Sequence, residues 1–228
     1  MRKTILTILA CVAAMLCQAQ ENPAYRIFTS DGEKTDYGTM LKALSKADVI
    51  FIGETHNCPI SHWIEYEVIS DMARKHPRGL VIGAEMLESD NQLLVDEYVS
   101  GVISSDRFES EAKLWDNHYT DYAPLLYLAR DKGFRFIATN VPRRYASFVK
   151  DNGLDALSGL SDAAKALMAP LPVAYDESTA ENEMFSFMNM MGGHGQQNHY
   201  AEAQALKDAT MAWFIAQNLD GKFIHVNG

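Results

Sequence analysis

The chain has 228 residues, and its 20 Lys and Arg against 30 Asp and Glu give a formal net charge of −10. Hydrophobic residues make up 47% and charged residues 22%, a globular composition that excludes a disordered or collagen-like chain. This length supports one compact domain with a sizeable core and is too short for three. Phosphate contacts need clustered Lys and Arg, so we do not expect this acidic chain to bind nucleic acid.

The first nineteen residues have the pattern of a secretory signal peptide. Arg2 and Lys3 precede an apolar run, Thr4–Leu16, that is too short to span a bilayer. Small residues then allow cleavage after Ala19. We therefore expect an exported protein, periplasmic or peripheral at the outer membrane.

Cleavage at that position would change both the charge and the cysteine content. The mature chain would carry 18 basic and 30 acidic residues, a net charge near −12. Cys58 would be the one cysteine left, so no disulfide could form within the mature chain. A lipoprotein is the alternative, although the residues before Cys11 and Cys17 make poor lipoboxes.

Short apolar runs alternate with longer amphipathic segments in the rest of the chain. We expect buried strands at Val49–Ile52, Leu80–Ile82, Phe134–Ala138 and Phe223–Val226. We expect helices at Ile60–Arg74, Asn91–Val99, Tyr122–Asp131 and Ala201–Asn218. This alternation predicts a single α/β domain over residues 20–228, with a mostly parallel sheet flanked by helices. Residues 152–198 show no strand pattern and are predicted to form a mostly helical insertion subdomain.

Polar side chains follow each of the four predicted strands. In chain order they are Glu54 and His56, Glu85, Asn140 and Arg143, and finally His225 and Asn227. Because the carboxyl ends of parallel strands meet at one edge of a sheet, a site is predicted there.

Glu54 and His56 give the sharpest local signal at that edge. They could act as acid and base or bind a metal ion, whereas the simpler reading is a loop in which Glu54 caps helix amides. His62 lies in the following helix and could face the same site, although a lone helical histidine is more often structural.

The segment Met184–Tyr200 holds four methionines within eight residues and then a glycine-rich turn with two histidines. Three readings stay open: an adaptable packing face, a Cu(I) site of thioethers and imidazoles, and an apolar haem pocket. In the haem reading, a tyrosinate could bind ferric iron and a lysine could pair with a propionate. The candidate residues in or near this segment are Tyr175, Met188, Met191, His194, His199, Tyr200 and Lys207.

Several motifs, taken in order and with their spacing, match one known family. They are Ile50–His56, Gly83–Met86, Trp115 with Tyr119–Tyr122, Ala138–Arg144, and Ala203–Ala205 with Asp208–Ala212. Together they resemble the ChaN family of haem-binding, iron-regulated exported proteins, within the Tiki/erythromycin-esterase-like superfamily. The resemblance covers almost the whole mature chain and implies an α/β fold and a role in bacterial haem uptake. It implies haem at a homodimer interface, with a tyrosine on the iron and His or Lys on the propionates, and outer-membrane uptake components as partners.

The superfamily also contains hydrolases with two Gly-x-x-His motifs and acidic residues. The first motif matches Gly53–His56, whereas the second would begin at Gly228, where the sequence stops. Since the sequence stops directly after a strand pattern, we expect C-terminal elements beyond it. The alternative function is thus a metal-dependent or acid/base hydrolase. Its candidate residues are Glu54, His56, Glu85, Arg143 and His225, with a divalent ion as the possible cofactor.

Overall fold

The computed structural model describes residues 23–176 and 199–228. The described part of the chain divides into two compact units, with the boundary between residues 40 and 41. In the first, strands β1 (Ile27–Phe28) and β2 (Lys34–Thr35) form a short antiparallel hairpin. Helix α2 (Tyr37–Leu44) crosses the boundary between the units. Within the described residues, no helix combines the length and the apolar character needed to cross a membrane.

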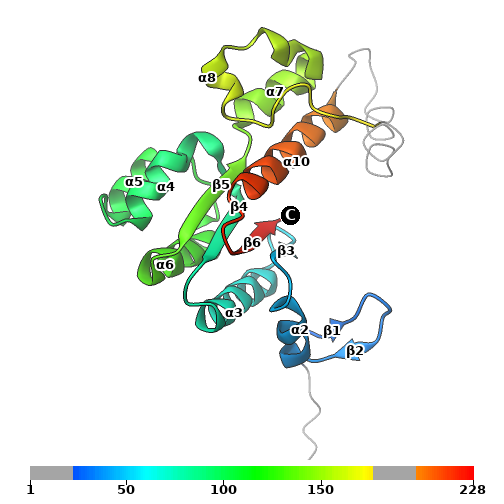
Figure 1. Cartoon of the computed structure of the whole chain (residues 1–228), viewed down its shortest axis with the longest axis vertical. Coiled ribbons are helices and arrows are strands. Elements are labelled where there is room, and N and C mark those ends of the chain that lie inside the picture. The colour runs from blue at the N-terminus through cyan, green and yellow to red at the C-terminus, as the bar shows by residue number, and fades with distance from the viewer. Residues whose placement is uncertain (1–22, 177–198) are drawn as a thin grey trace, which may run out of the picture. The chain divides into compact units, whose positions relative to one another are not determined.

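A four-stranded parallel sheet forms the centre of the second unit (Figure 1). Its strands are β3 (Val49–Gly53), β4 (Leu80–Glu88), β5 (Arg135–Asn140) and β6 (Lys222–Asn227). The spatial order is β3-β6-β4-β5, and every neighbouring pair is parallel. The predicted α/β fold is confirmed. Because β6 inserts between β3 and β4, residues from the far end of the chain reach the middle of the sheet edge.

Helices connect the strands at the predicted positions. They include α3 (Pro59–Lys75), α4 (Gln92–Val99), α6 (Ala123–Lys132) and α10 (Tyr200–Gln217), each within one residue of its predicted ends. Proline at the first position of α3 has no amide hydrogen to leave unpaired. Helix α6 ends at Gly133, whose φ of 68° suits glycine at a helix C-terminus. The apolar pattern therefore located these helices well.

Two further elements, absent from the sequence prediction, lie between α4 and α6. Helix α5 spans Ser105–Glu111 and is capped at its start by the Ser104 hydroxyl, which accepts from the Arg107 amide. A π-helical turn, η2, follows at His118–Tyr122. Such turns are rare and frequently lie at functional sites.

The predicted helical insertion is described as far as residue 176. Helix α7 (Arg143–Asn152) leads into a 3₁₀ segment, η3 (Leu154–Gly159), and a one-turn helix, α8 (Asp162–Lys165). Leu157 and Met168 pack with Val149 of α7 and Leu206 of α10 in one buried cluster. Helix α10 also contacts β5, so this cluster fixes α7 and α10 beside the sheet.

A second buried cluster packs α10 onto the sheet itself through Val81, Ile137, Ile215 and Phe223. Gly83 in β4 allows this packing, because a Cβ there would lie 2.7 Å from the Phe223 ring. The two clusters set the positions of the helix ends and strand ends that carry the polar residues.

Candidate functional site

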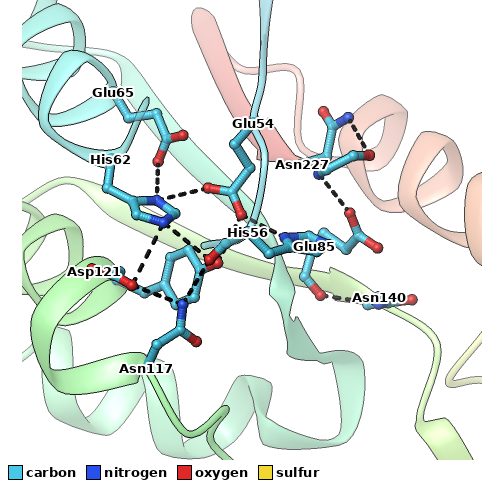
Figure 2. Close-up of polar contacts among 11 residues, drawn as sticks. Glu54, His56, His62, Glu65, Glu85, Asn117, Asp121, Asn140 and Asn227 are labelled. Atoms are coloured by element: carbon cyan, nitrogen blue, oxygen red, sulfur yellow. Dashed lines mark hydrogen bonds and ion pairs between the residues drawn. The ribbon is translucent and has the colours of Figure 1, made fainter. Parts of the chain in front are cut away.

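The carboxyl ends of all four strands bring polar residues to one edge of the sheet (Figure 2). The pairing of β4 with β5 shifts register after Ala84, which frees Glu85 from a regular strand position. The Glu85 carboxylate accepts a hydrogen bond from the Gly228 amide at 2.9 Å. The backbone carbonyl of Glu85 accepts a hydrogen bond from the Asn140 side-chain amide at 3.0 Å. Glu85 is thereby held between the ends of β5 and β6.

Glu54 and His56 form a hydrogen-bonded pair just beyond β3. His56 Nδ1 lies 2.6 Å from Glu54 Oε1, and the Tyr122 hydroxyl donates to the same oxygen at 2.7 Å. Burial alone would raise the pKa of Glu54, but the hydrogen bonds from Tyr122 and His56 outweigh it and leave the pKa below its usual value. The Glu54 side chain is fully buried, whereas the His56 side chain is 40% exposed. An ionised Glu54 therefore orients an imidazole that remains accessible.

Behind this pair lies a buried Glu–His–Glu cluster made of Glu54, His62 and Glu65. His62 Nδ1 is 2.9 Å from Glu54 Oε2 and 3.5 Å from Glu65 Oε2 (Figure 2). His62 and Glu65 are one turn apart on α3, so both face the same side of the helix. Burial and the neighbouring Glu54 carboxylate raise the pKa of Glu65 to about 9. In the absence of a cation, Glu65 is accordingly protonated near neutral pH.

The turn η2 and Asn117, the residue just before it, close the other side of the cluster. The Asn117 side-chain amide donates to the His56 carbonyl at 3.0 Å and to Asp121 Oδ2 at 2.8 Å. His62 Nε2 lies 3.2 Å from the same His56 carbonyl and 3.5 Å from Asp121 Oδ2. A carbonyl only accepts hydrogen bonds, so Nε2 of His62 carries a proton.

In front of the His56 side chain is a cavity of about 390 Å³, here called the rim cavity. This volume lies within the range of small-molecule sites. Its lining residues are His56, Glu85, Glu88, Trp115, Asn140, Val141, Arg143, Ala146, Ser147, Lys150, Tyr200, Ala203, Gln204 and Lys207. Cations from α7 and α10 thus face the polar sheet edge across a partly apolar space. A second cavity, of about 710 Å³, shares Trp115 and Arg143 with it.

The structure separates the candidates for hydrolysis into two groups. His56, Glu85 and Arg143 line the rim cavity, and Glu54 lies behind His56. His225 is 1% exposed within β6 and lies 2.8 Å from the Thr139 hydroxyl. Burial lowers the pKa of His225 to about 4, so this side chain is neutral near pH 7. It packs inside the sheet and is not among the residues that line the rim cavity.

The predicted haem contacts are also separated. Tyr200 and Lys207 line the rim cavity. His199 lies at the start of α10, where its Nδ1 is 2.5 Å from Glu202 Oε1. Tyr175 is described but is not among the residues that line the cavity. Met188, Met191 and His194 lie outside the described residues, so the haem-ligand assignment and the Cu(I) reading stay predictions.

Sequence reasoning missed Glu65, Asn117, Asp121 and Lys150 as site residues. One signal for Glu65 was present, because the buried stripe of α3 contains His62, Glu65, Ile69 and Met72 at helical spacing. Two polar residues on an otherwise apolar stripe indicate a buried polar partner. Asn117 and Asp121 carry no comparable signal, since the residues that they contact in the site, His56 and His62, lie more than fifty residues away.

Residues 40–228 match the family described as haem-binding uptake, Tiki superfamily, ChaN. Among solved structures, ChaN of Campylobacter jejuni with cofacially bound haem is 19% identical, with a TM-score of 0.67 over 92% of this chain and 81% of that one. This likeness confirms the fold. The toxin effector domain RRSP of Vibrio vulnificus is 21% identical and has a TM-score of 0.47 over 85% of this chain and 30% of its own.

One curated relative is a plant protein, RETICULATA-RELATED 5, chloroplastic, of Arabidopsis thaliana. It is 24% identical over 133 residues, which is 56% of this chain and 18% of the plant protein. The chain therefore spans less than a fifth of that relative.

Proposed function

Because the chain belongs to the haem-binding-uptake ChaN family of the Tiki superfamily, we propose that it binds haem in the rim cavity. The observation that carries this proposal is the lining of that cavity. It places Tyr200 together with three cationic side chains, Arg143, Lys150 and Lys207. An oxygen donor for ferric iron and partners for carboxylates thus share one space.

The residues present fit haem in three respects. A tyrosine is an established ligand of ferric haem iron, and Tyr200 is 44% exposed at the start of α10. Charge-assisted bonds from Lys and Arg suit propionate carboxylates. Trp115, Val141 and Ala146 offer apolar surface for the ring. Bound haem would supply a ferric centre that the Tyr200 oxygen could ligate.

Lys150 and Tyr200 lie side by side in the lining of the rim cavity. The Lys150 ammonium lies 5.6 Å from the centroid of the Tyr200 ring. In the proposed complex this cation would stay close to both the iron ligand and one propionate.

We further propose that the protein acts outside the cytoplasm in haem and iron uptake, as a homodimer that meets outer-membrane uptake components. The leader pattern of residues 1–19 supports export. Tyr200 is 44% exposed, so a second copy of the chain could approach it. Cofacial haem binding in Campylobacter jejuni ChaN supports an arrangement in which two copies bring their haem groups face to face. N-terminal sequencing of the exported protein should begin at Gln20 or Glu21, and retention of Met1 would contradict export.

Hemin titration of the purified chain tests the haem proposal. Wild type should bind hemin saturably with a high-spin, tyrosinate-type absorption spectrum. Tyr200→Phe should lose that spectrum, whereas Tyr127→Phe should keep it, because Tyr127 is 40% exposed but lines a different cavity. Tyr175→Phe completes the set, and loss of the spectrum there alone would move the ligand to Tyr175. Non-saturating uptake by wild type would contradict haem binding.

The pair of Glu54 and His56 supports a second candidate function, hydrolysis at the same edge. An imidazole oriented by a buried carboxylate can act as a general base, and Glu85 lines the same cavity. His56→Ala and Glu85→Gln should then abolish turnover of ester or peptide substrates. Both variants keep Tyr200, so the tyrosinate-type character of the hemin spectrum should remain even where hemin affinity changes, and the two functions separate by mutation.

A further inference from the structure

Three buried side chains behind the rim cavity have atoms without suitable partners. Glu65 is 1% exposed, and among the described residues neither of its carboxylate oxygens meets a donor in hydrogen-bond geometry. Glu54 Oε2 and His62 Nδ1 lie 2.9 Å apart as an ion pair, but among the described residues neither atom meets a partner in hydrogen-bond geometry. Buried polar atoms are nearly always partnered, so these side chains require either a shared proton or a bound cation between them.

The donor atoms are close enough to share one ion. One ligand atom each from Glu54, His62 and Glu65 lies within 4.8 Å of the other two. Nδ1 of His62 is 2.9 Å and 3.5 Å from the two carboxylate oxygens that face it. Two ligands at about 2.1 Å from a tetrahedral ion are roughly 3.4 Å apart, so small side-chain adjustments suffice.

The surroundings fix these donors in the orientation that an ion requires. The His56 carbonyl accepts a hydrogen bond from Nε2–H of His62, which leaves the Nδ1 lone pair directed toward the carboxylates. Metal-binding histidines usually have such a carbonyl on their second nitrogen. Tyr122 and His56 occupy Oε1 of Glu54 and leave Oε2 for the cluster.

We propose that Glu54, His62 and Glu65 bind one divalent transition-metal ion behind the rim cavity. One imidazole and two carboxylates suit Zn²⁺, Mn²⁺ or Fe²⁺. The site shares no residue with the lining of the rim cavity and does not depend on haem. Glu54 would then link the ion to His56 and act as a positioning residue for that imidazole.

Because the cluster is buried, the test must supply the metal ion while the protein folds. The side chains of Glu54, His62 and Glu65 are at most 5% exposed, so the ion is expected to enter during folding or local opening. The protein should therefore be unfolded with EDTA, refolded with Zn²⁺, Mn²⁺ or Fe²⁺, desalted and analysed for bound metal. Protein expressed in metal-supplemented medium provides a second preparation that needs no refolding.

Wild type should retain one ion per chain and show a higher melting temperature than the EDTA-treated form. Glu65→Gln has nearly the same shape and should retain less than a tenth of the metal. Glu67→Gln, two residues along α3 and outside the cluster, is the matched control and should behave as wild type. His62→Phe removes a donor while keeping an aromatic ring beside Tyr122, and it replaces Glu65→Gln if that variant does not fold.

Two results would overturn the proposal. One is a wild-type protein that retains no metal in either preparation, which would leave a shared proton as the occupant. The other is unchanged metal retention in Glu65→Gln together with loss in His56→Ala, which would move the ion to the rim cavity. Hemin spectra of the same variants keep this result separate from the haem proposal.

Discussion

The rim cavity and the buried Glu–His–Glu cluster meet at His56 but have opposite character. His56 faces the open side and Glu54 the closed side, with 2.6 Å between Nδ1 and Oε1. Arg143, Lys150 and Lys207 bring positive charge to the cavity. The cluster instead brings carboxylates together within the protein. The open side therefore suits an anionic ligand, and the closed side requires a cation or a proton.

This difference also separates binding effects from stability effects. Charges near water contribute at most about 1 kcal/mol to stability, because solvent screens them. Removing one member of a buried charged set costs about 3–5 kcal/mol, because the others lose their partner. Substitutions in the rim cavity should therefore mainly change ligand binding, whereas substitutions in the buried cluster should mainly change the free energy of unfolding.

The largest expected effect is that of Glu54→Ala. This change removes the acceptor for Tyr122 and His56 and the nearest carboxylate to His62. Measured by urea unfolding in EDTA, the free energy of unfolding should fall by about 3–5 kcal/mol. Glu85→Gln, on the open side, should lose less than about 1 kcal/mol, because an amide oxygen can still accept from the Gly228 amide. Equal losses would remove the distinction between the two regions.

The pH dependence of stability tests a buried histidine of η2, the turn beside the buried Glu–His–Glu cluster. His118 in η2 is 3% exposed, and burial lowers its pKa to about 4 from 6.5. Between these values the unfolded chain binds the extra proton and the folded chain does not, so stability falls as the pH falls from about 6.5 to 4. The shift corresponds to about 3 kcal/mol over that window.

The variant His118→Phe isolates this effect. It keeps an aromatic ring beside Phe108 and should remove a slope of up to about 1.4 kcal/mol per pH unit. Urea unfolding of both proteins at several pH values between 4 and 7 measures the difference. Parallel curves for wild type and variant would show that His118 titrates alike in both states.

A smaller loss is expected for Tyr122→Phe. The hydroxyl donates to Glu54 Oε1 at 2.7 Å, and a hydrogen bond to a charged group contributes about 1.5–3 kcal/mol. Tyr127→Phe provides the comparison, since its hydroxyl lies 3.4 Å from Glu109 at the surface and should contribute almost nothing. If both changes are neutral, Tyr122 does not hold Glu54 in place.

Sequence patterns predicted the elements that carry their signal locally. The apolar runs at β3 and β6 and the amphipathic spacing of α3 arise from neighbours along the chain. The grouping of Glu54, Glu85 and Asn140 also followed, because a parallel sheet brings its strand ends together. The local patterns thus gave the fold and one face of the site.

The closed side could not be predicted in the same way. Glu65 reaches Glu54 through packing of α3, and Asp121 and Tyr122 arrive from a π-helical turn that has no simple sequence period. The cations of the rim cavity likewise come from α7 and α10, whose positions depend on the buried cluster around Leu157 and Leu206. Long-range packing decides these contacts, and no local spacing records it.

The smallest expected effect is on the open side, where Lys207→Gln should change hemin binding and leave stability within about 0.5 kcal/mol of wild type. An accessible ion pair is worth about 0.2–1 kcal/mol, so the dissociation constant for hemin should rise roughly 1.4- to 5-fold. Lys132→Gln removes the same charge from an exposed site outside the rim cavity and should not alter it. The difference between the two variants should shrink as salt rises from about 0.05 to 1 M, because screening shortens the reach of the lysine charge. Equal affinities of the two variants at low salt would mean that Lys207 makes no contact with a propionate, and Arg143 and Lys150 would then be left as the cations that hold it.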